Sequence, residues 1–441
     1  MPAPDDQSHP SVLPQGRCLL GKFLNRSGSH WRSTDRDVKG DALNRGAQAG
    51  ESMKQPGESM KGEPMSGDPS LLRRLNAAAA LRVLRERDDI TVPELAALIG
   101  VSRPTAQDLT AQLLREGRLV ELRPGSGSVG RPARRFRFRA EAAHVLGVDI
   151  GAHKILVHAA DLLGRTVATQ RVAVTPELPG PRRLDAVREA IAGCLAQPAA
   201  AGVRPLATGV GTSGMVDAAG RVVESDSLPD WTGRDLTREL ADDSHGPVVV
   251  GNDIQLATLA ECTGGVSVGA RDCVYLYVGN RLGIGLWLRG ELHRGHHGAA
   301  GEMVAGDGWG NCYQRLLDWF AGHEGADRPT RENAARAVVT AAAAGDGGAR
   351  YTLRAFAEAL ADSLARHVAV LDPQSVVLGG GISRAGALLS EPFAERLGAL
   401  SPYAPTVQTS VLGEESTAIG AARLALEHID HAARKSPTLQ D

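Results

Sequence analysis

The stretch VLGVDIGAHKILVHAADL, residues 145–162, constrains the fold of this chain more than any other feature of its sequence. An apolar run ends at Ile150, a tight turn follows at Gly151, and a second apolar run comes after it. Two such runs around a short turn predict a β-hairpin. After Glu141 the chain is rich in strand patterns, and strands and helices then mix to about Ala433. We therefore expect a large α/β domain.

Apolar periodicity and turn residues place the other elements of this domain. We expect further strands in TVATQRVAV, ATGVGTSGMVD, VVVGND, CVYLYVG, GIGLWLRG and SVVLGGG. We expect helices in RLDAVREAIAGCLAQ, IQLATLAECT, NCYQRLLDWFAG, TLRAFAEALADSLARHVAVLD and STAIGAARLALEHIDHAA.

Length and composition indicate a soluble protein of two or three domains. The chain has 441 residues, of which 42% are hydrophobic and 23% charged, and domains usually hold about 100–200 residues. We find neither a membrane-spanning apolar run nor a secretory leader. Five scattered cysteines, at positions 18, 194, 262, 273 and 312, favour a reducing compartment over a disulfide framework. We expect a cytoplasmic protein.

The charges are distributed unevenly. Residues 71–139 carry fourteen arginines against seven acidic residues, a net charge of +7, although the whole chain has −2. A basic segment attached to an acidic domain suggests a polyanionic partner for that segment alone. A merely solvated face is the alternative interpretation of the charge, and we favour it less.

Four segments follow from these patterns. The first 68 residues are rich in Ser, Gly, Pro, Asp and Gln, and they repeat GESMK at 50–54 and 57–61. Such composition buries too little apolar surface to offset the entropy of ordering, so we expect disorder there. The remaining segments are a basic module at 69–139, the large domain at 140–433 and a loose tail at 434–441.

The basic module is predicted to hold three helices and a hairpin. The helices are expected in LLRRLNAAAALRVLRERDD, TVPELAALIG and VSRPTAQDLTAQLLREG, and two short strands in RLVELRPGSGSVGRPARRFRFRA. Thr91 caps the second helix and Gly100 ends it, while the third helix begins after Ser102. Leu95, Leu98 and Ile99 are expected to form one apolar face of the second helix.

Two helices joined by a glycine-containing turn fit a helix-turn-helix, and the following hairpin fits a wing. The polar start of the third helix is then free for the DNA major groove, where Arg pairs with guanine and Gln with adenine. The arginines near the Gly/Ser loop are suited to the DNA backbone or the minor groove. The candidate DNA-binding residues are Ser102, Arg103, Thr105, Gln107, Arg131, Arg134 and Arg135. Any one of them alone could be an ordinary surface residue.

The large domain carries an ordered series of motifs. These are VDIGAHKI, GVGTSGMVD, SLPDWTG, VVGNDIQLATLAE, VYLYVGNRLGIGLWLRGELHRGHHGAAGE and VVLGGGIS. Together they resemble the ROK family, whose name joins repressors, open reading frames and sugar kinases. The resemblance implies a two-lobed actin-like ATPase fold of the ribonuclease-H type. The basic module ahead of it resembles the winged helix-turn-helix of the repressor branch.

Both loops that would hold nucleotide phosphates depart from the family's pattern. The first retains Asp149, Gly151 and Lys154 but has Ala152 and His153 where the kinases have Gly-Thr. A phosphate cradle relies on close backbone N–H groups and a neutral hydroxyl donor, and His153 is most simply a turn residue. In the second loop, Gly279 and Gly283 flank Asn280 and Arg281, with no hydroxyl. The guanidinium of Arg281 would bind an anion or fill the space of a phosphate. We therefore expect no ATP use.

The sugar side of the family's site is partly retained. Asn252 and Asp253 match the family's Asn-Asp pair, whose aspartate resembles the general base, and Glu302 matches a sugar-contacting glutamate. In the pair His296–His297, we take His297 as a candidate hydroxyl contact rather than a metal ligand. Ala305 stands where the family's Gly-Glu-x-Gly-His motif has its histidine, and the family's three-cysteine zinc cluster is missing, since this stretch holds Cys312 alone. Structural zinc normally needs four ligands, so we expect no metal and no other cofactor.

Three functional hypotheses follow. The first is a transcriptional regulator, a repressor, which binds double-stranded operator DNA as a homodimer or homotetramer and senses a sugar or sugar phosphate without catalytic residues. The second is an active ATP-dependent sugar kinase with an appended DNA-binding domain, which Asp253 favours. The third keeps the DNA-binding role and assigns regulation to a protein partner or to abundance.

Overall fold

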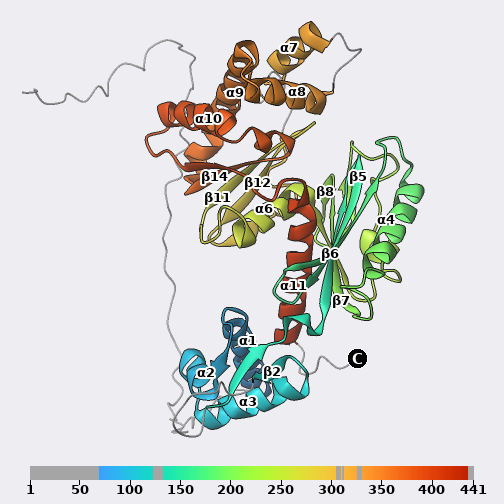
Figure 1. Ribbon diagram of the computed structural model, residues 1–441, viewed down its shortest axis with the longest axis vertical. Helices are drawn as coiled ribbons and strands as arrows, with labels where there is room; N and C mark the ends of the chain where they lie inside the picture. Colours follow the sequence, from blue (N-terminus) through green and yellow to red (C-terminus); the bar gives the residue numbers. More distant parts are fainter. Residues whose placement is uncertain (1–68, 123–132, 304–308, 310–311, 325–329, 436–441) are drawn as a thin grey trace, which may run out of the picture. The chain divides into compact units, whose positions relative to one another are not determined.

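The computed structural model of the chain describes residues 69–122, 133–303, 309, 312–324 and 330–435 (Figure 1). The chain divides into two compact units, residues 1–64 and 65–441, and every described residue lies in the second. The extension at 1–68, the loop with Arg131 and the end of the tail therefore lie outside the described residues.

The basic module contains three helices and a small antiparallel sheet of strand order β1-β3-β2. The short strand β1 was not expected. It pairs with β3 through Ile90 and Phe136, whose side chains are both buried. In chain order the elements are α1 (Pro69–Arg85), β1 (Ile90–Thr91), α2 (Val92–Ile99), α3 (Arg103–Arg115), β2 (Leu119–Leu122) and β3 (Arg135–Phe138).

The ends of the module's second and third helices follow from their caps. The Thr91 side chain accepts from the backbone N–H of Glu94, whose carboxylate accepts from Thr91 in return. Gly100 ends α2 with φ at 69°, the left-handed region that glycine enters without strain. Ser102 caps α3. These predicted boundaries are confirmed.

The predicted apolar face of α2 is wrong at one position. Leu95 is buried and Ile99 packs against the same core, but the side chain of Leu98 is 47% exposed. An eight-residue helix turns about 100° per residue. Only part of its apolar surface therefore meets α1 and α3, and Leu98 falls outside that part.

The large domain contains two five-stranded sheets. The first has strand order β10-β7-β4-β5-β6; β4 pairs parallel with β7 and antiparallel with β5, as the hairpin pattern predicts. We call this sheet with the helix α4 (Gly180–Leu195) the first lobe. Its strands are β4 (His144–Ile150), β5 (Lys154–Asp161), β6 (Thr166–Ala173), β7 (Pro205–Thr212) and β10 (Val248–Asn252). The first lobe also includes the shorter elements η1 (Ala140–Ala142), β8 (Met215–Val216), β9 (Val222–Glu224) and α5 (Leu236–Glu239), with the loops between them.

The second sheet has strand order β13-β12-β11-β14-β15. Helices of the chain's C-terminal third cover one of its faces, where Val274, Leu276 and Val278 enter their apolar core. We call this sheet with those helices the second lobe. Its strands are β11 (Cys273–Val278), β12 (Leu282–Leu288), β13 (Glu291–His293), β14 (Ser375–Gly379) and β15 (Thr406–Thr409). Its helices are α7 (Gln314–Glu324), α8 (Arg331–Ala343), α9 (Gly347–Leu371), η3 (Gly381–Ala385) and α10 (Ala387–Leu400).

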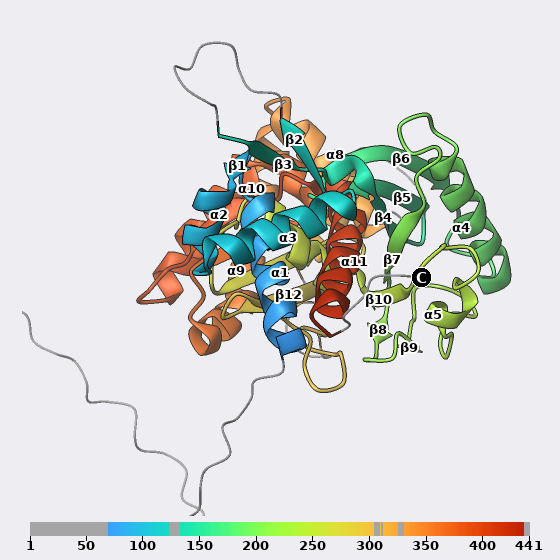
Figure 2. The ribbon, with the colours of Figure 1, turned by 90° about the horizontal axis from the view of Figure 1, so that it is seen from below.

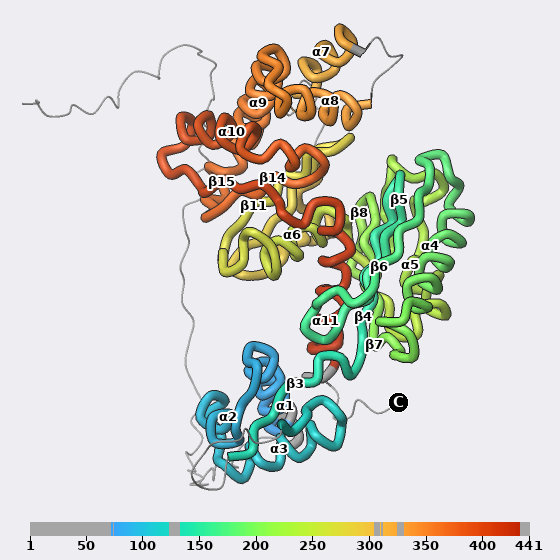
Figure 3. The backbone as a smooth tube through the Cα atoms, in the orientation of Figure 1, coloured from blue at the N-terminus to red at the C-terminus, as the bar shows by residue number. Residues whose placement is uncertain are grey.

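Two helices connect the sheets. The helix α6 (Asp253–Gly264) follows β10 and packs on β11 and β12, and α11 (Ser416–Lys435) packs on α6, β4 and β7 (Figure 3). Glycines allow this approach: a Cβ at Gly147 or Gly209 would lie within about 2 Å of carbonyl oxygens of α11. The 3-10 turn η4 (Gly413–Glu415) leads into α11.

No helix in the described segments combines the length and the apolar character that a membrane crossing requires.

Candidate functional site

Three strands of the first sheet end side by side and carry the site. Ile150 of β4 is in register with Thr212 of β7, which is in register with Asn252 of β10. The chain turns at each of these ends. The carboxyl edge of a parallel sheet is where open α/β folds place their ligands. The candidate residues Asp149 and Asp253 lie at this edge.

Asp149 is buried next to the ammonium group of Lys154. The Nζ atom of Lys154 lies 3.3 Å from its Oδ2 atom. Burial raises the pKa of Asp149, and the Lys154 ammonium opposes part of that rise. A buried carboxylate with one partner retains acceptor capacity for a ligand.

Asn252 and Asp253 begin α6 in different roles. The Asn252 side chain accepts from the backbone N–H groups of Ile254 and Gln255 and donates to the carbonyl of Gly214 at 2.9 Å. It therefore fixes the helix start. Burial, followed by the nearby Asp149 carboxylate, raises the pKa of Asp253 to about 7. A carboxylate with such a pKa is suited to exchange a proton near neutral pH.

Glu302 completes a carboxylate cluster, which we define as Asp149, Asp253 and Glu302. Partial desolvation raises the pKa of Glu302, and the Arg281 guanidinium opposes this rise. Glu302 in turn raises the pKa of Asp253. His297 is exposed and its ring contacts that of His296 edge to face, with centroids 4.4 Å apart. None of its described contacts joins it to the cluster.

The first altered loop is a hydrogen-bonded turn. The backbone N–H of Gly151 donates to the carbonyl of Lys154 at 2.9 Å, and His153 is exposed. The fully buried guanidinium of Arg183 donates to the carbonyls of Gly151 at 2.6 Å and Thr175 at 2.8 Å. The Arg183 side chain of α4 therefore holds this turn in place through hydrogen bonds to backbone carbonyls.

The second altered loop is attached to both lobes. The Asn280 side chain accepts from the backbone N–H of Glu332 at the start of α8 and donates to the Glu332 carboxylate, at 3.0 and 3.1 Å. The Tyr313 hydroxyl donates to the carbonyl of Gly279. Arg281 lies 3.4 Å from the Asp226 carboxylate, which belongs to the first lobe. The asparagine and arginine that replace kinase residues thus have partners of their own.

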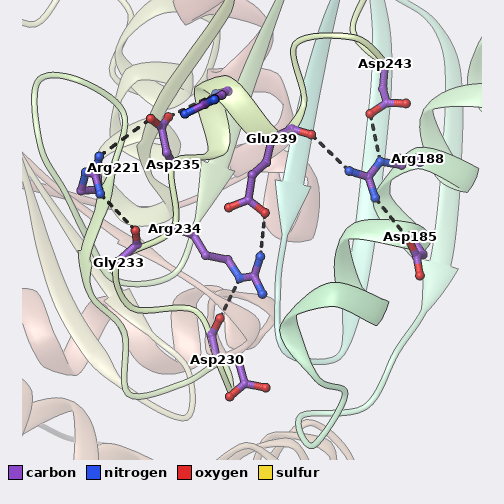
Figure 4. A network of polar contacts seen from close by, with 10 residues as sticks. Asp185, Arg188, Arg221, Asp230, Gly233, Arg234, Asp235, Glu239 and Asp243 are labelled. Carbon is purple, nitrogen blue, oxygen red and sulfur yellow. Dashed lines mark hydrogen bonds and ion pairs between the residues drawn. The ribbon is translucent and has the colours of Figure 1, made fainter.

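The loop Ser225–Thr232, which contains the Arg281 partner Asp226, lines a surface hollow together with Pro176 and Glu177. Arg234 supports this loop by donating to the carbonyl of Asp230 at 2.7 Å and to the Glu239 carboxylate at 2.6 Å (Figure 4). Trp231, fully buried, donates from Nε1 to Thr212 at 2.8 Å. The hollow is lined by none of Asn252, Asp253 and Glu302.

The candidate DNA-binding residues of α3 separate into two kinds. Ser102 and Thr105 bond to each other, with their hydroxyl oxygens 2.9 Å apart, and Ser102 also accepts from the Thr105 backbone. Arg103 and Gln107 are exposed and four residues apart. They therefore lie on one face of the helix.

The candidate arginines of the hairpin carry ion pairs. Arg134 donates to Glu121, with its Nε atom 2.6 Å from the carboxylate, and Arg135 donates to Asp89, with its Nε atom 2.9 Å away. Both arginines are exposed. Arg131 lies outside the described residues, as does Ala305.

Among the described residues, no group of three or more His, Cys, Asp or Glu side chains has the arrangement of a metal site. Cys312 is buried and its sulfur lies 3.7 Å from the Ser363 hydroxyl.

The family model of the ROK family matches residues 145–428, more than half of the chain. The chain belongs to the ROK family. Its two sheets and connecting helices are accordingly the mixed α/β, actin-like kinase fold of that family.

The curated relatives of this ROK chain include enzymes and repressors. It is 33% identical to the bifunctional enzyme NanE/NanK of Brucella melitensis biotype 1 over 293 residues, which are 64% of this chain and 54% of the enzyme. This chain thus spans about half the length of that relative. It is 28% identical to the glucokinase of Streptomyces coelicolor, covering 64% of this chain and 97% of the glucokinase. The xylose repressor of Caldicellulosiruptor bescii is 22% identical and matches 75% of this chain and 88% of its own.

Solved structures give the same picture of the fold. A ROK family glucokinase from Streptomyces griseus, in complex with glucose and AMPPNP, is 27% identical with a TM-score of 0.56; the match covers 65% of this chain and 100% of the glucokinase. A ROK family transcriptional regulator, described as a homologue of the E. coli MLC protein, has a TM-score of 0.67 at 20% identity, over 82% of this chain and 97% of its own.

Sequence reasoning missed three residues at the site. Arg183 supports the first loop, Asp226 pairs with Arg281, and Glu414 accepts a hydrogen bond at its backbone carbonyl from Lys154. Arg183 lies in the first turn of α4, and its sequence position does not distinguish it from the exposed Arg182; only the structure shows that Arg183 is fully buried.

Proposed function

We propose that this chain is a transcriptional repressor whose residues 69–139 form a winged helix-turn-helix that binds operator DNA. The observation that carries the proposal is the exposed pair Arg103 and Gln107 on α3, in a module with a net charge of +7. The capping of α3 by Ser102 leaves this pair as the two candidates for reading bases. The match to a xylose repressor, which extends over 75% of this chain, supports the same function.

Within this proposal, residues 140–433 form a sensor that binds a sugar or sugar derivative and mediates homodimer or homotetramer formation. The carboxylate cluster and Asn252 supply acceptors and a donor suited to sugar hydroxyls. The arrangement of Asn280 and Arg281, each engaged with protein partners, supports binding without phosphoryl transfer. Arg134 and Arg135 would contact the DNA backbone by exchanging their carboxylate partners for phosphates.

Selection of duplexes from a random pool by the full chain tests the proposal. We expect enrichment of one motif, arranged as two symmetric half-sites if the chain binds as a dimer. Recovery of no sequence above the random background would refute sequence-specific DNA binding.

A second candidate function, ATP-dependent phosphorylation of a sugar, rests on Asp253. The elevated pKa of about 7 and the position at the carboxyl edge suit a general base. A coupled assay for ADP release with a panel of hexoses tests this candidate. Turnover that disappears in Asp253→Asn would establish the kinase, and absence of turnover with the whole panel supports the sensor.

A further inference from the structure

The start of α11 lies at a carboxylate that bridges the two lobes. The Glu414 side chain accepts from Arg171 of β6 at 2.8 Å through one oxygen and from Arg384 of η3 at 2.7 Å through the other. Its backbone carbonyl accepts from Lys154, which also pairs with Asp149. Glu414 therefore has partners in the first lobe, in the second lobe and at the carboxylate cluster.

The first turn of α11 contacts the cluster directly. The Thr417 hydroxyl donates to the backbone carbonyl of Asp253 at 3.3 Å. This hydrogen bond links Asp253, the first residue of α6, to the first turn of α11.

Close backbone contacts hold the middle of α11 in place. A Cβ at Gly209 would lie 1.8 Å from the carbonyl oxygen of Ala421, and one at Gly420 would lie 1.8 Å from that of Leu256. The first contact is with β7 and the second with α6. Packed interfaces of this kind resist continuous deformation. These contacts therefore fix α11 against both β7 and α6.

The second half of α11 packs on the basic module (Figure 2). Its apolar side chains share one core cluster with those of α1, including Ala80, Leu84, Ala425, Leu426 and Ile429. The Arg85 guanidinium is 18% exposed and pairs with Asp430 at 2.5 Å. Its Nε and Nη2 atoms have no hydrogen-bond partner in the described part of the chain. Asp430 is thus the single hydrogen-bonding partner of this arginine there.

We propose that α11 transmits the relative position of the lobes, set at Glu414, to α1 of the DNA-binding module. The inference rests on the proposed function for its biological meaning. Ligand binding at the carboxylate cluster would change the Glu414 contacts, and α11 would pass that change over the distance from Ser416 to Asp430, about 21 Å at 1.5 Å per residue. If ligand binding at the carboxylate cluster changes the affinity for DNA, DNA binding must change the affinity for the ligand by the same factor.

Hydrogen–deuterium exchange of the full chain tests this coupling without ligand or DNA. Glu414→Gln removes the charge that pairs with Arg171 and Arg384, whose side chains are both exposed. We expect the hydrogen–deuterium exchange rates of the α1 amides to change by about fivefold or more, which is the lower end of typical coupling between two sites in one protein. The matched control is Glu395→Gln, which breaks the exposed pair with Arg354 inside the second lobe. It should leave α1 unchanged.

The reverse perturbation completes the test. Asp430→Asn should alter exchange at residues 410–416, which include Glu414, as well as at α1. Unchanged α1 exchange in Glu414→Gln, or an effect of Asp430→Asn confined to α1, would overturn the proposal. If Glu414→Gln fails to fold, Arg384→Gln removes only the second-lobe contact and the same α1 readout applies. Because no DNA is present, failure of the coupling is distinguishable from failure of DNA binding.

Discussion

The guanidinium of Arg85 and the carboxylate of Asp430 lie 2.5 Å apart although 345 residues separate them in the sequence. The ion pair joins the first helix of the basic module to the last helix of the large domain. Around it the apolar side chains of both helices form one core cluster. Side-chain contacts therefore join the module to α11 in addition to the chain connection, and we expect the stability of the module to depend on them.

We expect Asp430→Ala to lower the free energy of unfolding by about 1.5–3 kcal/mol, because it leaves a largely buried charge without its hydrogen-bond partner. Equilibrium denaturation with urea measures the change. Asp362→Ala is the matched control. It breaks an ion pair with Arg396 in which both side chains are more than 40% exposed, and such pairs contribute about 0–1 kcal/mol. Equal effects of the two substitutions would contradict a special role for the Arg85–Asp430 pair.

Gly209→Ala should destabilise the chain by about 1–3 kcal/mol or more, as overpacking does. The added Cβ would lie 1.8 Å from the Ala421 carbonyl oxygen, so α11 must move away from the sheet. Gly322→Ala in α7 is the comparison, since a Cβ there meets no atom within 4 Å. Alanine favours a helix over glycine by about 1 kcal/mol. Thermal melting of both variants is the measurement, and tolerance of Gly209→Ala would show that α11 is not closely seated.

Asp253→Asn should stabilise the chain in a pH-dependent way. The pKa of Asp253 rises from 3.8 to about 7 on folding, so between these values the folded state holds a proton that the unfolded state has lost. Its contribution to stability therefore falls as pH rises through this range. A pKa that differs by one between the folded and unfolded states corresponds to about 1.4 kcal/mol, and asparagine removes the effect.

The melting temperatures of wild type and Asp253→Asn should be close near pH 4 and diverge up to about pH 7, with the variant more stable above it. The exposed Asp242→Asn serves as the control and should show no such trend. A difference that is constant across the range would show that Asp253 ionises normally.

Arg103→Ala and Gln107→Ala should each reduce affinity for the selected duplex by about 1–3 kcal/mol and relax the preference at one base pair. Gln112→Ala, on another face of α3 where Gln112 bonds to Glu116, should change neither. Fluorescence anisotropy with duplexes substituted at single positions gives both quantities. Loss of affinity with no loss of base preference would assign these residues to the DNA backbone instead.

The local features of this fold were largely predictable. The hairpin at β4 and β5, the capping of α2 by Thr91 and the glycine end at Gly100 each depend on a few neighbouring residues. Period-two alternation also places Val274 and Leu276 on the covered face of the second sheet. These signals lie within the elements they specify.

The long-range features were not predictable from the same patterns. The exposure of Leu98 depends on how far α1 and α3 cover α2, and the pairing of Arg281 with Asp226 depends on the positions of two lobes. Nothing in the local sequence of Glu414 distinguishes it from a surface glutamate. Its role emerges only when β6 and η3 bring Arg171 and Arg384 to it.

The most direct measurement is binding of the full chain to DNA from upstream of its own gene, compared with a scrambled duplex at one stated salt concentration. We predict a preference of about a hundredfold or more, equivalent to about 2.7 kcal/mol. Equal and strongly salt-dependent binding to both duplexes would mean that the arginines recognise only phosphate. That result, joined to failure of selection from a random pool, would contradict the assignment of this chain as a sequence-specific regulator.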